Sequence, residues 1–143
     1  MSILPRRKVV INMVKSDKKK DERDFLIAIV DDHIDTVVSI SNYLEANGFR
    51  TVWAYTGEDA LKLCKKESPA LLLLDIRMPG MNGFEVAKLL PKEQKIIFMS
   101  GFDELDDRAK AFSNCIGTLQ KPIDFGKMVS ALRAHFGLKA REF

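Results

Sequence analysis

The sequence has little cysteine, no long apolar run and no internal repeat, and these absences exclude several classes of protein. The two cysteines of the 143-residue chain, Cys64 and Cys115, lack metal-ligand spacing, so we interpret them as small apolar residues in a reducing cytosol. No apolar run approaches the roughly 18 residues of a membrane helix. The start, "MSILPRRKVVINMV", has neither the apolar stretch nor the cleavage site of a secretory signal. The remaining class is an ordinary soluble domain with one core.

Positive charge is concentrated at the start of the chain. Residues 1–24 contain eight Lys or Arg and four Asp or Glu, whereas the remaining residues contain fifteen and sixteen. The globular part is therefore close to neutral, which argues against a nucleic-acid-binding core. The charged stretch "SDKKKDERD" has no aromatic residue, so we expect residues 1–24 to form a basic, flexible extension. Our main interpretation is an unstructured tail, or a true start at Met13. A contact with a membrane surface or a nucleic acid is the alternative.

From residue 25 onward, apolar strands alternate with amphipathic helices. Helices are expected from residue 34 to a stop at Gly48, over 58–66 after a Thr56 cap, from an Asn82 cap to Pro91, around 105–113, and from an Asp124 cap to Gly137. The expected strands are Phe25–Asp32, Phe49–Tyr55, Leu71–Asp75, Lys95–Ser100 and Gly117–Lys121. This fivefold strand–helix alternation with nearly continuous apolar strands predicts an α/β fold. The sheet would be parallel, five-stranded and doubly wound, with helices on both faces.

Charged and polar residues stand at the carboxyl ends of four expected strands. Asp31 and Asp32 end the first strand, and Asp75 ends the third, directly after four leucines. Ser100 ends the fourth strand and Lys121 ends the fifth. Ligands of open parallel sheets bind outside the carboxyl ends of the strands, so we expect these five side chains to share one site. A single strand-terminal Asp is often only a helix cap, but the combination of all five is specific.

Three carboxylates in one place repel one another unless a cation neutralises them. Hard oxygen ligands suit Mg²⁺, which keeps several waters and bridges to phosphate. A carboxylate can also act as a nucleophile and carry an aspartyl phosphate. A metal, a lysine and a hydroxyl would stabilise the oxygens of a transferred phosphoryl group. In this interpretation a rigid strand holds Asp75 at the rim of the core, and the turns "MPG" and "MNG" leave its face open.

Four motifs, "IVDDH", "LLLLDIRMPGMNG", "FMSGF" and "LQKPID", together resemble the receiver domain of two-component response regulators. The resemblance covers residue 24 to about residue 137, nearly all of the globular part. It implies a flavodoxin-like fold with strand order 2-1-3-4-5. It also implies transfer of a phosphoryl group from a histidine kinase or a phosphohistidine protein to this chain.

The resemblance also implies roles for the acidic residues. Asp75 matches the phosphoacceptor, which also contacts the metal. Asp32 matches a direct Mg²⁺ ligand, and Asp31 matches the acid that supports the metal through water. The backbone carbonyl of Arg77 matches the remaining protein ligand. Mn²⁺ is an expected substitute for Mg²⁺.

Further roles follow from the resemblance for residues near the fourth and fifth strands. Ser100 matches the switch hydroxyl, and Gly101 after it leaves space for movement. Lys121 matches the lysine that pairs with phosphate, and Pro122 follows a peptide bond that is usually cis in the family. One position departs from the family pattern. Thr118 replaces the usual aromatic residue whose rotation reports phosphorylation, so the switch signal is expected to differ.

The resemblance implies a domain at 25–137, a short tail at 138–143, a cytoplasmic location and no membrane contact. The expected partners are a sensor histidine kinase or phosphotransfer protein and a downstream protein target. A homodimer through the fourth and fifth helices is a further expectation. Only "LKAREF" follows Gly137, so we expect no DNA-binding domain here: either the chain is a single-domain receiver or it is part of a longer protein. The chain is expected to be a signalling phosphoacceptor that assists its own phosphorylation and dephosphorylation, and not an enzyme.

Two other classes of protein share parts of this pattern. A pseudo-receiver keeps the fold as an interaction module but usually loses an acidic or lysine position, and none is lost here. A metal-dependent phosphatase with an aspartyl nucleophile has a second acid two residues after the first, where this chain has Arg77.

Overall fold

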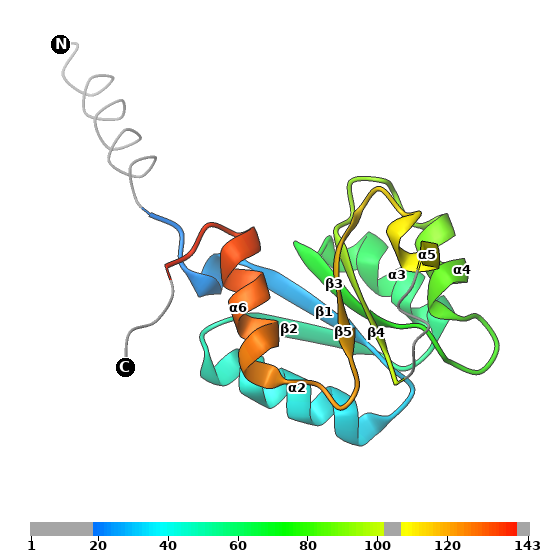
Figure 1. Ribbon diagram of the computed structural model, residues 1–143, viewed down its shortest axis with the longest axis horizontal. Helices are drawn as coiled ribbons and strands as arrows, with labels where there is room; N and C mark the ends of the chain where they lie inside the picture. Colours follow the sequence, from blue (N-terminus) through cyan, green and yellow to red (C-terminus); the bar gives the residue numbers. More distant parts are fainter. Residues whose placement is uncertain (1–18, 102–106, 140–143) are drawn as a thin grey trace, which may run out of the picture.

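The computed structural model describes residues 19–101 and 107–139, and it contains one parallel sheet (Figure 1). The strand order is β2-β1-β3-β4-β5, with every neighbouring pair parallel. This order and the fold class confirm the prediction. The strands are β1 (Leu26–Val30), β2 (Arg50–Ala54), β3 (Leu71–Asp75), β4 (Ile96–Ser100) and β5 (Cys115–Gln120).

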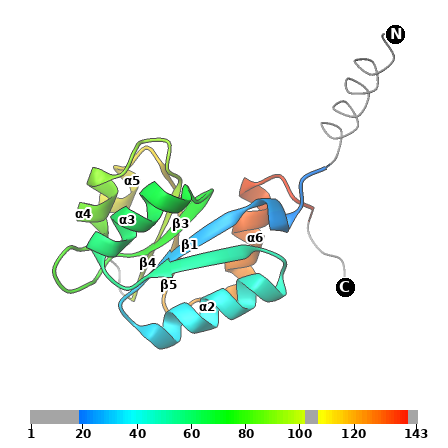
Figure 2. The ribbon, with the colours of Figure 1, turned by 180° about the vertical axis from the view of Figure 1, so that it is seen from behind.

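Helices cover both faces of this sheet, as Figures 1 and 2 show from opposite sides. Buried residues of α2 and α6 belong to one core cluster, and buried residues of α3, α4 and α5 belong to the other. None of the helices in the described part of the chain has the length and hydrophobicity needed to cross a membrane. The helices are α2 (Ile34–Ala46), α3 (Gly57–Glu67), α4 (Gly83–Leu89), α5 (Asp107–Lys110) and α6 (Phe125–His135), preceded by a 3₁₀ turn, η1 (Glu22–Asp24).

The central strand β3 shows why its sequence is apolar without interruption. Leu72 and Leu74 pack into the α3–α5 cluster, whereas Leu71 and Leu73 pack into the α2–α6 cluster. All four are fully buried, because alternate side chains of a strand point to opposite faces and both faces are covered. Truncating one of them to alanine would cost about 2–5 kcal/mol. A strand held this firmly fixes the position of the residue at its end, Asp75.

The predicted helix caps are confirmed. Thr56 accepts a hydrogen bond from the amide of Asp59, and the side chain of Asp124 accepts one from the amide of Lys127. Asn82 forms a capping box, in which its side chain and its amide pair with Glu85. These side chains satisfy amides that a helix start leaves without partners, so each helix begins where its cap stands.

The region between β4 and β5 differs from the prediction. β5 begins at Cys115 instead of Gly117, because Asn114 anchors the strand: its side chain donates to the carbonyl of Gln94, and its own carbonyl accepts from Ile96. In the described residues α5 extends only over Asp107–Lys110, not to residue 113. The start of the predicted helix, at 105 and 106, lies outside the described residues.

The segment just before β1 packs against α6 and the start of β2. Glu22 forms an ion pair with Arg133 of α6, whose side chain is 6% exposed. The Arg50 side chain donates to the carbonyl of Arg23 at 2.7 Å. The rings of Phe25 and Phe136 stack with centroids 4.0 Å apart. Glu22 and Arg23, which lie within the predicted flexible extension, thus contact the folded domain. Residues 1–18 lie outside the described residues.

Candidate functional site

Lys121 joins two of the predicted acids at the carboxyl edge of the sheet. Its Nζ lies 2.6 Å from Oδ2 of Asp31 and 3.2 Å from Oδ1 of Asp75. Asp31 follows β1, Asp75 ends β3 and Lys121 follows β5, so three parallel strands deliver these groups to one point. Charge-assisted hydrogen bonds of this length are among the stronger polar contacts in proteins.

Asp31 is fully buried, and the surrounding groups hold it in place. One carboxylate oxygen accepts the ammonium of Lys121, and the other accepts the backbone amide of His33 at 2.9 Å. The ring Nδ1 of His33 also lies 3.1 Å from that second oxygen. Both oxygens therefore have partners, as a buried carboxylate requires.

Asp75 is 3% exposed, and its environment disfavours its charge. Burial and, after it, the negative charge of Asp31 raise the pKa of Asp75 to about 6, against the opposing effect of Lys121. Burial alone would lower the pKa of Lys121, but its hydrogen bond to Asp31 and the charges of Asp75 and Asp31 outweigh burial, so that pKa is raised. One ammonium among three carboxylates leaves the site with an excess of negative charge.

Asp32 supplies the observation that tests whether a cation fits. Its Oδ1 atom is buried and accepts no hydrogen bond from the described residues. Asp31, Asp32, His33 and Asp75 each place one potential ligand atom within 4.8 Å of the others. A buried carboxylate oxygen without a partner is costly, and a hard cation bound among oxygen ligands would satisfy it. The residues present therefore fit a divalent ion.

The loop after β3 is shaped by two glycines with different tasks. Gly80 has φ +75° and provides the left-handed turn of "MPG". Gly83 begins α4 directly behind the phosphoacceptor candidate: a Cβ there would lie 2.4 Å from the carbonyl oxygen of Asp75. The Gly83 amide donates to the carbonyl of Ile76 at 2.8 Å. Gly83 thus allows α4 to start in contact with the end of β3.

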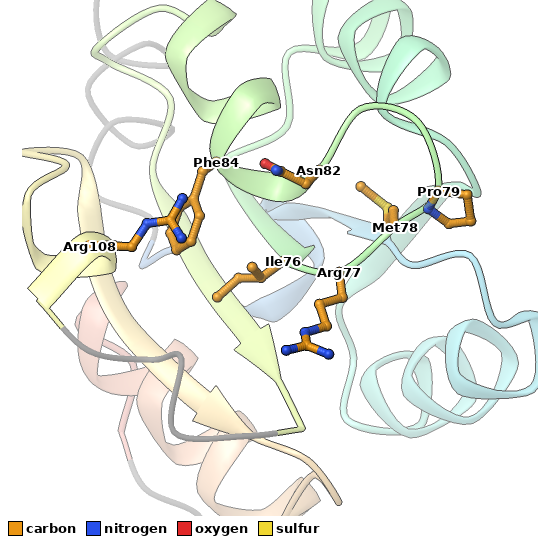
Figure 3. A pocket seen from close by; sticks show the side chains of 7 residues that line it. All are labelled: Ile76, Arg77, Met78, Pro79, Asn82, Phe84 and Arg108. Carbon is orange, nitrogen blue, oxygen red and sulfur yellow. The ribbon is translucent and has the colours of Figure 1, made fainter.

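Next to this loop lies an open pocket of about 450 Å³ (Figure 3). Arg77 extends from the loop on one side of it, and Arg108 extends from α5 on the other. The guanidinium of Arg108 lies 4.5 Å from the ring centroid of Phe84. Arg77 itself is exposed. The role of its backbone carbonyl as a metal ligand stays a prediction.

The remaining predicted residues lie on β4, on β5 and just after them. Ser100 is 1% exposed at the end of β4, and its carbonyl accepts the amide of Lys121 at 2.7 Å. Within the part of the chain that the structure describes, a Cβ at Gly101 would meet no atom within 4 Å. Thr118 is exposed on β5, paired in register with Phe98. The Lys121–Pro122 peptide bond is cis.

His33 is a site residue that was not predicted from the sequence. Its ring lies within the acidic cluster, beside two of the predicted carboxylates. The signal for it was its place in "IVDDH", directly after the acid pair and at the start of a helix. A residue that directly follows these acids lies at the same edge of the sheet as they do.

The fold and the site define a class: flavodoxin-like α/β proteins with an acidic, lysine-paired site at the carboxyl edge of the sheet. The sequence pattern of the response regulator receiver domain matches residues 27–133. The chain therefore belongs to the family of receiver domains of two-component response regulators.

Individual relatives agree with this assignment. The sporulation initiation phosphotransferase F of Bacillus subtilis is 32% identical over 120 residues, covering 80% of this chain and 95% of that protein. The polar-differentiation response regulator DivK of Brucella ovis is 26% identical over 117 residues, covering 78% and 95%. Among solved structures, chemotaxis protein CheY4 of Vibrio cholerae superposes with a TM-score of 0.71 at 26% identity, covering 77% of this chain and 97% of that one.

Proposed function

We propose that this chain is a phosphoacceptor: it takes a phosphoryl group from a phosphohistidine donor onto Asp75 with the help of Mg²⁺. The observation that carries the proposal is the position of Lys121 Nζ between Asp31 and Asp75, at 2.6 and 3.2 Å. In this arrangement a nucleophilic carboxylate has a cation beside it, and two more carboxylates lie close by. Family membership supports the same role.

The residues for the cation are Asp32, Asp75 and the carbonyl of Arg77, with Asp31 acting through water. When bound, Mg²⁺ would supply positive charge for the oxygens of the phosphoryl group. Mn²⁺, another divalent ion that carboxylate and carbonyl ligands suit, is an expected substitute. The buried Oδ1 of Asp32, which accepts no hydrogen bond from the described residues, supports this assignment.

In the proposed reaction an Oδ of Asp75 attacks the phosphorus, the new O–P bond forms and the P–N bond to the donor imidazole breaks. The electron pair of that bond returns to the imidazole nitrogen of the donor. Asp75 must be ionised to attack, and its pKa of about 6 leaves it ionised at neutral pH. Lys121, freed from part of its contact with Asp75, would pair with a phosphoryl oxygen.

The phosphoryl group adds about 1.5 to 2 negative charges at the end of β3. In the proposed switch, Ser100 and the residues after it move toward these charges. A Cβ at Gly101 would have no contact within 4 Å among the described residues, which supports such a shift. Because Thr118 replaces an aromatic residue at the switch position, the output would not depend on ring rotation there. Unchanged amide exchange from Gly101 to residue 113 on addition of beryllofluoride would contradict this step.

The proposed partners are a sensor histidine kinase or a phosphotransfer protein as donor and a downstream protein as target. The relative named as a phosphotransferase supports a place in a phosphorelay. We further propose a cytoplasmic location, which agrees with the free thiols of Cys64 and Cys115. A homodimer would use the fourth and fifth helices of the fivefold pattern, which are α5 and α6.

The proposal is tested by intact mass after incubation with acetyl phosphate. We expect one added phosphoryl group with Mg²⁺, and none with a chelator or in the Asp75→Asn variant. A folded protein that gains no phosphoryl group and binds no beryllofluoride would instead be a pseudo-receiver, an interaction module that acts without phosphorylation.

A further inference from the structure

His33 places a ring nitrogen among the carboxylates of the site. Its Nδ1 lies 3.1 Å from Oδ1 of Asp31 and 3.3 Å from Oδ1 of Asp32. The latter is the buried oxygen that accepts no hydrogen bond from the described residues. One nitrogen thus lies close to two carboxylate oxygens, in a site otherwise made of oxygen atoms and one ammonium.

The side chain of His33 does not cap its helix. His33 is the N-cap residue of α2, where a side chain normally accepts a hydrogen bond from the helix amides, but its imidazole makes no such bond. The imidazole lies instead against Asp31 and Asp32. Its backbone amide donates to Asp31, which fixes the residue relative to the acids. The side chain is 69% exposed, so an ion from solvent has access to the ring.

The spacing of these atoms matches that of ligands around one metal ion. Metal–ligand bonds of about 2.1 Å place neighbouring ligands about 3.0 Å apart in an octahedron and about 3.4 Å apart in a tetrahedron. The 3.3 Å between Nδ1 and Oδ1 of Asp32, the proposed direct ligand, lies within this range. Asp75 places its own ligand atom within 4.8 Å of the others.

We propose that His33 is a nitrogen ligand of the divalent site and gives it a preference for transition metals such as Co²⁺ and Zn²⁺ over Mg²⁺. This inference rests on the proposed function, which places a divalent ion at Asp32 and Asp75. Imidazole suits Zn²⁺ and similar ions, whereas Mg²⁺ prefers oxygen ligands only. The nitrogen that binds is Nδ1, with the ring proton on Nε2.

The chain contains only two histidines, His33 and His135, which gives the test a matched control. His135 lies at the end of α6 and lines a different pocket. Co²⁺ and Mg²⁺ affinities are measured by calorimetry for the wild type, His33→Ala, His33→Gln and His135→Ala. The ring-proton NMR signals of both histidines are followed during Co²⁺ addition.

Mutating groups that only support metal ligands costs about 10- to 100-fold in affinity, so losing a direct ligand should cost at least about tenfold. We expect this loss for Co²⁺ in both His33 variants, with Mg²⁺ affinity nearly unchanged and His135→Ala equal to the wild type. We also expect the signals of His33 alone to shift strongly with Co²⁺.

Mg²⁺ binding combined with unchanged Co²⁺ affinity in the His33 variants would overturn this inference and leave the proposed function intact. Failure of the wild type to bind either ion would overturn both. Equal losses of Co²⁺ and Mg²⁺ affinity would show that His33 only positions the acids, which also overturns the inference.

Discussion

Replacing Asp75 with asparagine is expected to stabilise the fold in the absence of divalent cations. Asparagine keeps the size of the side chain and removes a charge that the buried site disfavours. Lys121 keeps its 2.6 Å contact with Asp31 in the variant, so no cation is left without a partner. The wild-type carboxylate, in contrast, faces the charge of Asp31 in a nearly closed environment.

The magnitude follows from the pKa of Asp75, which rises from its ordinary 3.8 to about 6 in the fold. At about 1.36 kcal/mol for each pH unit, this difference corresponds to about 3 kcal/mol. Because the folded state binds the proton more tightly than the unfolded chain, ionisation of Asp75 lowers the free energy of unfolding. This loss of stability is absent below pH 3.8, grows as the pH rises toward 6, and is complete above a pH of about 6.

The assay is urea unfolding with chelator present at two pH values. At a pH of about 7.5 the variant should gain up to about 3 kcal/mol, which raises the urea midpoint by about 1–3 M for slopes of about 1–3 kcal/mol per M. At a pH of about 4.5 the gain should fall to about 1 kcal/mol. Asp35→Asn, an exposed carboxylate in the first turn of α2, is the control and should give no gain. A variant no more stable than the wild type at the higher pH, or a gain independent of pH, would show that ionised Asp75 does not destabilise the fold.

Three further changes probe other parts of the site and its support. Lys121→Met should slow phosphorylation of Asp75 by acetyl phosphate by about 100-fold, measured by intact mass over time, because a group that stabilises the transferred charge is lost. Glu22→Gln should lower the free energy of unfolding by about 3 kcal/mol in urea, because it leaves the buried Arg133 without its charged partner. Gly83→Ala should lower it by about 3 kcal/mol, because the added Cβ collides with the carbonyl of Asp75.

Each of these changes has its own contradicting result. Phosphorylation of the Lys121 variant at the wild-type rate would remove the lysine from the mechanism. Glu22→Gln should lose more stability than Glu58→Gln on the exposed start of α3, and equal losses would mean that the ion pair adds little. Gly101→Ala is the control for Gly83→Ala, because a Cβ at Gly101 meets none of the described atoms within 4 Å. A similar loss of stability in both variants would contradict a collision at Gly83.

The sheet and most of the site could be predicted because both depend on the same strand pattern. An uninterrupted run such as "LLLL" fits only a strand that is covered on both faces, and parallel strands bring their carboxyl ends to one edge. The sequence therefore predicts that Asp75 and Lys121 lie close together. Their contact at 3.2 Å follows from that topology.

The parts that were not predicted depend on contacts between distant residues. The start of β5 is set by the hydrogen bonds that Asn114 makes with Gln94 and Ile96, at the start of the neighbouring strand β4. Glu22 lies in a charged stretch whose composition predicts full exposure to solvent, but it forms an ion pair with Arg133 of the last helix. The sequence predicts a turn at Gly83, but glycine is needed there because a side chain would collide with the backbone of Asp75. Local patterns carry no signal for contacts of this kind.

The central claim is that the carboxylate of Asp75 receives the phosphoryl group. The most direct measurement is to phosphorylate the protein with Mg²⁺ and acetyl phosphate, reduce the acyl phosphate with borohydride, and map the modified residue by peptide mass spectrometry. Phosphorylation of Asp75 predicts homoserine at position 75 and nowhere else, and none without Mg²⁺. Homoserine at Asp31 or Asp32, or a stable phosphoryl group on Ser100 that survives borohydride, would contradict it.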